Sequence, residues 1–243
     1  MTYVIVGAST GLGRALAEKF ASENNDLIII SSDIDDLDAL KNDLQNRFNV
    51  KIYSIEMSFE KNLNFNKIDD IVKKTNDIDG ILLPIGFSDH HDNPHIDGDK
   101  IISLFNINLV NVCIFVNHFL NSIKNKKLTI TGFGSISAIR GRSRNSTYSS
   151  AKRALESYFE SLRHSELNSK ITIQFYILGY LDTNLTFGEK LVGFKPANII
   201  NLANKIYQNR FKDFGKKTYP SYWKITTFLL PLLPWFIFKK IKF

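Results

Sequence analysis

The sequence contains a single cysteine, Cys113, among 243 residues. One cysteine excludes a disulfide within the chain and a metal site built from several thiolates. A reducing compartment is therefore the natural expectation, with Cys113 packed inside a helix.

The chain also lacks internal repeats and, until its last residues, any block of like charge. Its formal net charge of +7 comes from scattered lysines and arginines. Nucleic-acid-binding proteins instead gather basic residues into a stripe or carry a reader motif, so we expect no nucleic-acid partner. The 44% hydrophobic and 23% charged residues are globular values, which argue against a disordered chain.

Neither end of the chain carries a long uninterrupted apolar run. The opening TYVIVGAS reads as a strand and lacks the charged region, apolar stretch and cleavage site of a secretory signal. The apolar run from Ile225 to Phe238 is shorter than the roughly 20 residues of a membrane-crossing helix, and Pro231 and Pro234 interrupt it. We therefore expect the body of the protein to be cytoplasmic.

Short β-branched runs alternate with segments of helical period along the chain. The expected strands are TYVIV, LIIIS, KIYSI, GILLPI, KLTITGF and ITIQFYI. The expected helices are residues 12–22, 35–47, 64–75, 100–122, 147–168 and 196–210. This alternation predicts an α/β fold with a doubly wound, Rossmann-like parallel sheet and helices on both faces. The length fits one domain, residues 1–222, followed by a tail, residues 223–243.

A glycine-rich turn, GASTGLGRALAEKF, directly follows the first expected strand. Gly7 would allow a tight turn, while Gly11 and Gly13 would let the backbone approach a pyrophosphate. The helix that begins at Leu12 would direct its free N–H groups at the same negative charge. The spacing departs from the usual dinucleotide fingerprint, and an ordinary strand-to-helix turn is the alternative.

Asp33 follows the second expected strand, where a carboxylate could accept hydrogen bonds from an adenosine ribose. Neither Ser31 nor Ser32 offers the positive charge that a 2′-phosphate would want, so NAD is favoured over NADP. The alternative is that Asp33 caps the next helix.

Tyr148 and Lys152 stand four residues apart in RNSTYSSAKRALESYF, so both emerge on one helix face. Ala151, Leu155 and Phe159 continue this apolar stripe. A lysine there is costly unless it has a function, and its charge would lower the pKa of the phenol. The pair therefore predicts that Tyr148 is a general acid and base during hydride transfer to or from nicotinamide.

Together with GASTGLG and YSSAK, three further segments resemble the short-chain dehydrogenase/reductase family from residue 3 to about residue 210. They are FNINLVNV with Asn108, TGFGSISA with Ser135, and ILGYLDTNL with Thr183. The resemblance implies a catalytic tetrad of Asn108, Ser135, Tyr148 and Lys152. It implies that Ser135 holds the substrate oxygen, Lys152 contacts the nicotinamide ribose, Asn108 supports a proton relay and Thr183 contacts the carboxamide.

The resemblance also implies a set of residues that bind NAD or NADP. They are Gly7, Ser9, Thr10, Gly11, Leu12, Gly13, Asp33, Glu56, Gly86, Tyr148, Lys152, Gly179 and Thr183. Glu56 is the best match to the acidic residue that the family carries after its third strand. The chain departs from the family with Leu83-Pro84-Ile85-Gly86 after the fourth strand and Leu178-Gly179 after the sixth. The first departure puts a structural support of the central strand in doubt.

The loop GFSDHHDNPHIDGD contains His90, His91 and His95 among aspartates. Hydride transfer by the tetrad needs no metal, so we expect a solvated loop and no metal ion.

The C-terminal segment YWKITTFLLPLLPWFIFKKIKF combines aromatic residues with a lysine cluster. This composition is typical of a segment that lies at the surface of an anionic membrane. The alternative is a tail that contacts another subunit or covers the core.

A weaker resemblance connects the chain with the reductase component of the polyprenyl-phosphoryl-ribose 2′-epimerase system. It rests on IGF after the fourth strand, on Arg140, Arg142 and Arg144, and on the aromatic, basic C-terminus. It implies reduction of a keto-sugar on a lipid carrier, with the arginines near the lipid phosphate or simply at the surface.

The two resemblances together imply an NAD(P)-dependent oxidoreductase that acts on a keto-sugar carried by a lipid or nucleotide, in cell-envelope glycan synthesis. One alternative is a soluble reductase of 3-oxoacyl thioesters or small alcohols, and another is a non-catalytic dinucleotide-sensing scaffold. The family resemblance implies a homodimer or homotetramer, and the tail suggests a place at the inner face of the membrane.

Overall fold

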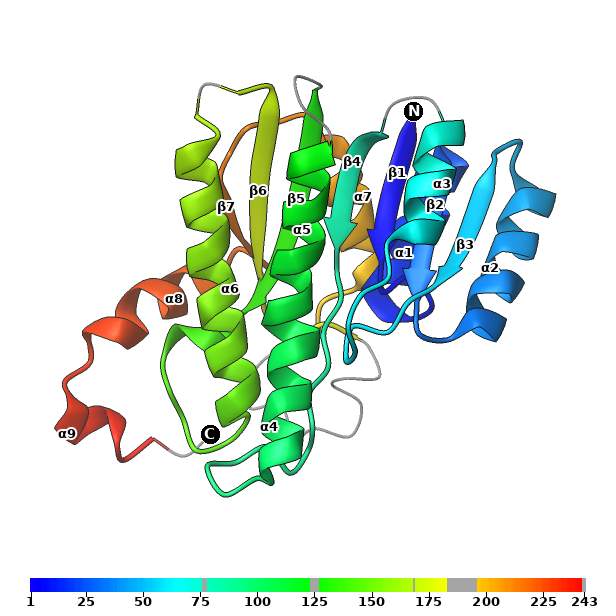
Figure 1. Ribbon diagram of the computed structural model, residues 1–243. Coiled ribbons are helices and arrows are strands. Elements are labelled where there is room, and N and C mark those ends of the chain that lie inside the picture. Colours follow the sequence, from blue (N-terminus) through cyan, green and yellow to red (C-terminus); the bar gives the residue numbers. More distant parts are fainter. Residues whose placement is uncertain (76–77, 123–126, 168, 183–195, 242–243) are drawn as a thin grey trace.

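Seven parallel strands form one sheet in the computed structural model, which describes residues 1–75, 78–122, 127–167, 169–182 and 196–241. The strand order is β3-β2-β1-β4-β5-β6-β7, so the chain winds outward from β1 in one direction and then from β4 in the other (Figure 1). The strands are β1 (Thr2–Val6), β2 (Asp26–Ser31), β3 (Ile52–Glu56), β4 (Ile78–Leu83), β5 (Leu128–Ser135), β6 (Ile171–Leu178) and β7 (Lys216–Tyr219).

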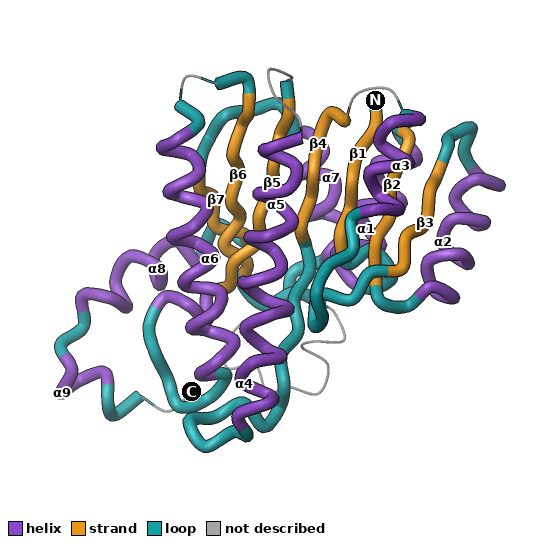
Figure 2. The backbone as a smooth tube through the Cα atoms, viewed as in Figure 1, coloured by secondary structure: helices purple, strands orange, loops and turns teal. Residues whose placement is uncertain are grey.

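Helices cover both faces of the sheet, as Figure 2 shows. One apolar layer lies between the sheet and α1 (Gly11–Ser22), α2 (Ile34–Arg47) and α7 (Ile199–Asn209). The other lies beneath α3 (Asn66–Lys74), α5 (Asn111–Ser122) and α6 (Ser146–Ser165). The central strands are buried on both sides, which explains their nearly continuous runs of isoleucine, leucine and valine.

The predicted doubly wound fold is confirmed, and each of the six expected strands and helices has a counterpart within a few residues. The sequence did not reveal β7, which has the sequence KKTY and no apolar run. This strand pairs with β6, and Lys216 of β7 also contacts the buried Glu156 of α6 at 2.8 Å. Tertiary contacts therefore determine this strand, because its own residues have little apolar surface to bury.

One long apolar helical segment leads into α5. The segments α4 (Gly98–Phe105), η1 (Asn106–Val110) and α5 continue as one helix, Gly98–Ser122, which contains an 18-residue stretch with a mean hydropathy of 1.6. By length and composition alone this helix could cross a membrane. Its residues Val112, Phe115, Val116 and Phe119 instead belong to the buried core.

The last helices, α8 (Trp223–Leu232) and α9 (Trp235–Phe238), extend from the body as an arm beside α6 (Figure 1). Trp223 at the start of the arm is buried against the main body, where a Cβ on Gly179 would lie 2.3 Å from its indole nitrogen. The arm is thus anchored at its first residue. The boundary that we placed at residue 222 stays a prediction.

Candidate active site

A cavity of about 790 Å³ opens at the carboxyl ends of the strands. Its walls include the loops that follow β1, β2, β3, β4, β5 and β6, together with residues of the C-terminal arm. In an open α/β sheet, ligands bind at this edge, where the strand order reverses. The reversal lies between β1 and β4 in this protein, and Gly7 and Gly86 line the cavity there.

The glycine-rich turn forms one end of the cavity. Gly7 and Gly11 have φ angles of 80° and 53°, a left-handed region that glycine enters without strain. A Cβ on Gly13 would lie 1.8 Å from the Gly7 carbonyl oxygen, so the helix start can approach the turn only without a side chain there. Gly7 and Gly11 line the cavity, whereas Gly13 acts behind it.

The N-terminus of α1 faces the cavity without a side-chain cap. Thr10 is the N-cap residue but its side chain caps no backbone N–H, and the first turn of α1 contains no acidic residue. Ser9, Thr10 and Leu12 line the cavity, and the Ser31 hydroxyl donates a hydrogen bond to Ser9 Oγ at 2.9 Å. Free N–H groups and the positive end of the helix dipole fit the pyrophosphate of a dinucleotide.

Besides Gly13, two further expected cofactor residues lie outside the cavity, Asp33 and Glu56. Asp33 is exposed, and its carboxylate caps α2 by accepting the Asp36 N–H at 3.0 Å. Glu56 ends β3, is also exposed, and is absent from the lining residues. The lining at this end includes Ser31, Ser32, Met57, Ser58, Phe59 and Glu60. The capping alternative for Asp33 is therefore seen in the structure.

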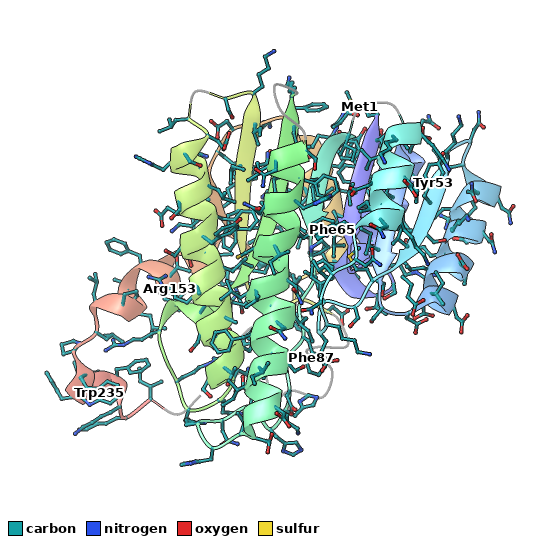
Figure 3. All side chains as sticks on the ribbon, in the orientation of Figure 1. Met1, Tyr53, Phe65, Phe87, Arg153 and Trp235 are labelled. Carbon is teal, nitrogen blue, oxygen red and sulfur yellow. The ribbon has the colours of Figure 1, made fainter. Side chains whose placement is uncertain are left out.

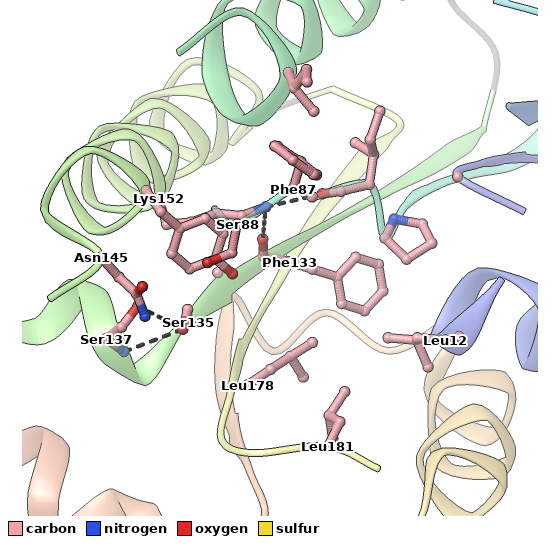
Figure 4. Close-up of a pocket in the computed structure, with 18 of the residues that line it drawn as sticks. Leu12, Phe87, Ser88, Phe133, Ser135, Ser137, Asn145, Lys152, Leu178 and Leu181 are labelled. Atoms are coloured by element: carbon pink, nitrogen blue, oxygen red, sulfur yellow. Dashed lines mark hydrogen bonds between the residues drawn. The ribbon is translucent and has the colours of Figure 1, made fainter. Parts of the chain in front are cut away.

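Tyr148 and Lys152 lie on one face of α6, and both line the cavity. The Lys152 ammonium lies 5.9 Å from the centre of the Tyr148 ring. It donates hydrogen bonds to the carbonyl oxygens of Ile85 at 3.0 Å and Phe133 at 3.2 Å, as Figure 4 shows for Phe133. Backbone carbonyls therefore stabilise this cation, whose residue is only 3% exposed.

Burial shifts both groups away from their charged forms. It lowers the pKa of Lys152 from 10.5 to about 8. It also raises the pKa of Tyr148, although the hydrogen bond with Ser135 and the nearby Arg142 guanidinium act in the opposite direction. We expected a lowered tyrosine pKa, but the net shift in this structure is upward. Desolvation of the phenolate outweighs the neighbouring positive charge.

Asn108 lies behind the lysine in a π-helical turn and is completely buried. Its amide accepts the Phe87 N–H at 3.1 Å and donates to the carbonyl oxygens of Phe87 and Leu104. A Cβ on Gly86 would lie 3.2 Å from Lys152 Nζ and 3.4 Å from Asn108 Oδ1. Gly86 thus lets the lysine and the asparagine approach the same stretch of backbone after β4.

Ser135 ends β5 at the same end of the cavity (Figure 4). Its hydroxyl lies 2.9 Å from Ser137 Oγ and accepts the Ser137 N–H at 3.2 Å. The structure thus brings Ser135, Tyr148 and Lys152 together at the cavity wall, with Asn108 directly behind.

Asp92 is a site residue that the sequence did not reveal. It is only 2% exposed, although it lies in the loop that we expected to be solvated. Its carboxylate accepts the backbone N–H groups of Thr147 at 2.9 Å and Tyr148 at 2.8 Å, together with the Ser146 hydroxyl at 3.2 Å. The Asn145 N–H also donates to the Asp92 carbonyl oxygen at 2.8 Å. Asp92 therefore fixes the first turn of the helix that carries the tyrosine.

The loop after β6 and the C-terminal arm both contribute residues to the cavity wall. Gly179 lines the cavity, and Thr183 lies outside the described residues. Trp223, Thr226, Leu230 and Ile241 of the arm form part of the cavity wall.

The three arginines that we expected near a lipid phosphate line the cavity mouth. Arg140 instead holds the arm, because its guanidinium donates to the carbonyl oxygens of Leu230 and Leu233 and lies 4.0 Å from the centre of the Phe238 ring. The expected phosphate contact therefore stays a prediction for Arg142 and Arg144 only.

The histidines of the loop after β4 do not gather with other ligands. Within the described part of the chain, no group of three histidine, cysteine, aspartate or glutamate residues could hold a metal ion.

Residues 1–190 match the model of the family described as short chain dehydrogenase. The chain is similar to the 3-oxoacyl-[acyl-carrier-protein] reductase of Aquifex aeolicus, with 23% identity over 193 residues that cover 75% of each chain. It is also similar to the very-long-chain 3-oxoacyl-CoA reductase of Mus musculus, with 26% identity over 228 residues, or 88% of this chain and 69% of the relative.

A solved short-chain dehydrogenase from Sphingobium yanoikuyae, in complex with NADPH, has a TM-score of 0.79 and 17% identity over 99% of this chain and 96% of that chain. This likeness shows the same fold. The chain therefore belongs to the short-chain dehydrogenase family of NAD(P)-dependent oxidoreductases, which act on CH–OH and carbonyl groups.

Proposed function

We propose that the protein interconverts a ketone and an alcohol on an amphiphilic substrate, with Asn108, Ser135, Tyr148 and Lys152 as its catalytic tetrad. The observation that carries this proposal is that Ser135, Tyr148 and the buried Lys152 line one cavity, with Lys152 one helical turn from Tyr148 and a glycine turn suited to a dinucleotide in the same wall. Bound NAD or NADP would supply or accept the hydride at this place.

Each residue of the tetrad would have its own role in binding the substrate and moving the proton. The Ser135 hydroxyl would hold the substrate oxygen by a hydrogen bond, and the Tyr148 hydroxyl would donate the proton or take it back. The Lys152 ammonium would favour the tyrosinate when it forms, because it is the cation one turn below the ring. Asn108 would hold the backbone after β4 in place, through its paired hydrogen bonds with Phe87.

A pair of tyrosine substitutions on α6 tests this proposal. Tyr148→Phe should lower kcat by about 10²–10⁴-fold, the usual contribution of general acid–base catalysis, and should leave cofactor binding unchanged. Tyr158→Phe is the matched control, since it removes a hydroxyl on the same helix that donates to the Cys113 carbonyl oxygen at 3.3 Å. Unchanged biological activity of Tyr148→Phe, alongside normal cofactor binding, would instead favour the non-catalytic dinucleotide-sensing scaffold.

We further propose that NAD is preferred over NADP. The cations that line the described cavity are Arg140, Arg142, Arg144 and Lys152, and all four lie at the substrate end. Serines line the end near β2, where a 2′-phosphate would need a positive charge, and the exposed Asp33 would repel it. Fluorescence titration with NADH and NADPH tests this, and tighter binding of NADPH would refute it.

Two substrate classes fit an amphiphile with an anionic group. A keto-sugar on a lipid or nucleotide carrier, in cell-envelope glycan synthesis, is supported by Arg142 and Arg144 at the cavity mouth, where a phosphate could bind. A 3-oxoacyl thioester is supported by the similarity to two 3-oxoacyl reductases. The rate of NADH oxidation can be measured with acetoacetyl-CoA as the substrate and, separately, with an extract of polyprenyl-phosphate sugars. The substrate that gives the faster rate would distinguish the two classes.

We also propose a cytoplasmic location at the inner face of the membrane, with peripheral contact through the tail, and pairing of subunits through α5 and α6. Ile102, Val110 and Ile114 support the pairing, because they are exposed along the helix that leads into and forms α5. Light scattering after gel filtration tests it: a dimer or tetramer is expected, and a monomer at micromolar concentration would contradict it.

A further inference from the structure

The C-terminal arm carries a dense group of exposed apolar side chains. Of the 17 large hydrophobic residues that are exposed in the described chain, nine lie between residues 222 and 241. They are Tyr222, Ile225, Phe228, Leu229, Leu232, Trp235, Phe236, Ile237 and Ile241. Figure 3 shows Trp235 at the outer end of this arm, away from the sheet. Exposed apolar surface on this scale indicates an interaction site.

Helix α8 has two different apolar faces. Ile225, Phe228, Leu229 and Leu232 follow the spacing of one helix face, and all four are exposed. Trp223, Thr226 and Leu230 follow the spacing of another face, and all three line the cavity. The same helix therefore borders the active site on one side and solvent on the other.

The charges around the arm have one sign. Asp213 is the last acidic residue, and the 30 residues from Phe214 to Phe243 contain six lysines and no acid. Lys224, Lys239 and Lys240 are exposed beside the apolar residues of α8 and α9. Aromatic and aliphatic side chains with neighbouring lysines fit the boundary between the headgroups and acyl chains of an anionic bilayer.

Arg140 holds the arm in a fixed position relative to the tyrosine helix. It contacts the carbonyl oxygens of Leu230 and Leu233 and the ring of Phe238, as described above. Phe238 is itself buried, so only one side of α9 faces the body. A surface that binds the outer side of the arm would therefore lie at the mouth of the cavity.

We propose that the outer side of the arm docks on an anionic lipid bilayer, and that the inner face of α8 leads the apolar chain of the substrate from that bilayer to Tyr148. The docking face consists of the exposed apolar residues of α8 and α9, which are Ile225, Phe228, Leu229, Leu232, Trp235, Phe236 and Ile237. The first half deepens the membrane contact proposed above, whereas the second half rests on the proposed reaction with an amphiphilic substrate. The charge of the arm favours anionic lipid over a second copy of this chain, because two such arms would bring like charges together.

Binding to vesicles tests the docking. The full-length protein should float with vesicles of phosphatidylglycerol and phosphatidylcholine, and more weakly with phosphatidylcholine alone or at high salt. The double variant Phe228→Glu, Trp235→Glu should lower the partition coefficient by more than about tenfold, since two apolar anchors are replaced by charges of the wrong sign. The matched control is Leu167→Glu, Ile200→Glu, whose wild-type residues are 71% and 60% exposed on the body.

Each outcome of the vesicle experiment either supports or overturns docking of the arm on a bilayer. Loss of binding in the arm variant alone, with circular dichroism unchanged, supports docking. Equal binding of both double variants, or binding that is indifferent to anionic lipid, overturns it. A full-length protein that ignores vesicles but changes its oligomeric state on substitution of Phe228 and Trp235 also overturns it, and makes the arm a subunit contact.

Turnover of short and long substrates tests the role of the inner face. Leu230→Ser should lower the ratio of kcat/KM for 3-oxopalmitoyl-CoA to that for acetoacetyl-CoA by about tenfold, as expected when an apolar chain loses a contact. Leu232→Ser, two residues away on the outer face, should leave this ratio near its wild-type value without vesicles. Equal ratios in both variants would overturn the chain path. Turnover of neither thioester, by a protein that still floats, would instead refute the thioester part of the proposed function and leave the docking intact.

Discussion

Asp92→Ala should loosen the first turn of α6, which holds Tyr148 in position. The wild-type carboxylate accepts two backbone N–H groups, from Thr147 and Tyr148, and is itself 2% exposed. Loss of a helix cap costs about 0.5–2 kcal/mol. The N–H of the buried Thr147 would also lose its partner, which adds about 1–2 kcal/mol. We therefore expect the free energy of unfolding to fall by about 3 kcal/mol.

The same substitution should lower turnover. Tyr148 is the third residue of α6, so fraying of the first turn moves its hydroxyl away from Ser135. A displacement of about 1 Å can cost about 100-fold in rate, and we expect kcat to fall by about 10–100-fold. The Kd for the cofactor should change little, because Asp92 contacts the start of α6 and not the glycine turn.

Two further variants separate the positioning of Tyr148 from a general loss of stability. Asp92→Asn keeps an acceptor oxygen but loses the negative charge at the helix N-terminus, so it should restore most of kcat and remain about 1 kcal/mol less stable than the wild type. Asn198→Ala is the control, because Asn198 caps α7 by accepting two backbone N–H groups, at 2.9 and 3.1 Å. Urea denaturation and steady-state kinetics measure both effects. A wild-type kcat in Asp92→Ala, or an equal fall in Asn198→Ala, would refute the positioning role.

The remaining predictions concern the glycine turn, the sheet and the buried lysine. Gly13→Ala places a Cβ 1.8 Å from the Gly7 carbonyl oxygen; NADH binding, followed by fluorescence, should weaken more than about tenfold because the turn must open. Gly132→Ala meets a phenylalanine ring at 2.5 Å, whereas Gly141→Ala meets nothing within 4 Å. In urea denaturation the first should therefore cost about 1–3 kcal/mol, and similar stabilities of the two variants would contradict this. Lys152 has its pKa lowered by burial from 10.5 to about 8, so between these pH values the unfolded chain holds more protons than the folded chain. The cofactor-free protein should gain up to about 3 kcal/mol relative to Lys152→Met as pH rises through this window, and parallel pH profiles would exclude the shift.

The sequence by itself determined those features that depend on local spacing. A residue four positions from another on a helix shares its face, so Tyr148 and Lys152 could be paired without any coordinates. The apolar runs predicted the strands for the same reason, and a strand followed by glycines and a helix predicted the turn that contains Gly7. Such patterns hold wherever the segment lies in the fold.

Only the tertiary structure decided which distant residues complete the site. Asp92 caps a helix more than 50 residues further along the chain, and Arg140 holds carbonyl groups 90 and 93 residues away. Asp33 could equally have met a ribose or capped α2, and its exposed position with a bond to Asp36 favours the cap. Polar contacts of this kind carry no periodic signal, because they depend on how the loops after separate strands meet at one edge of the sheet.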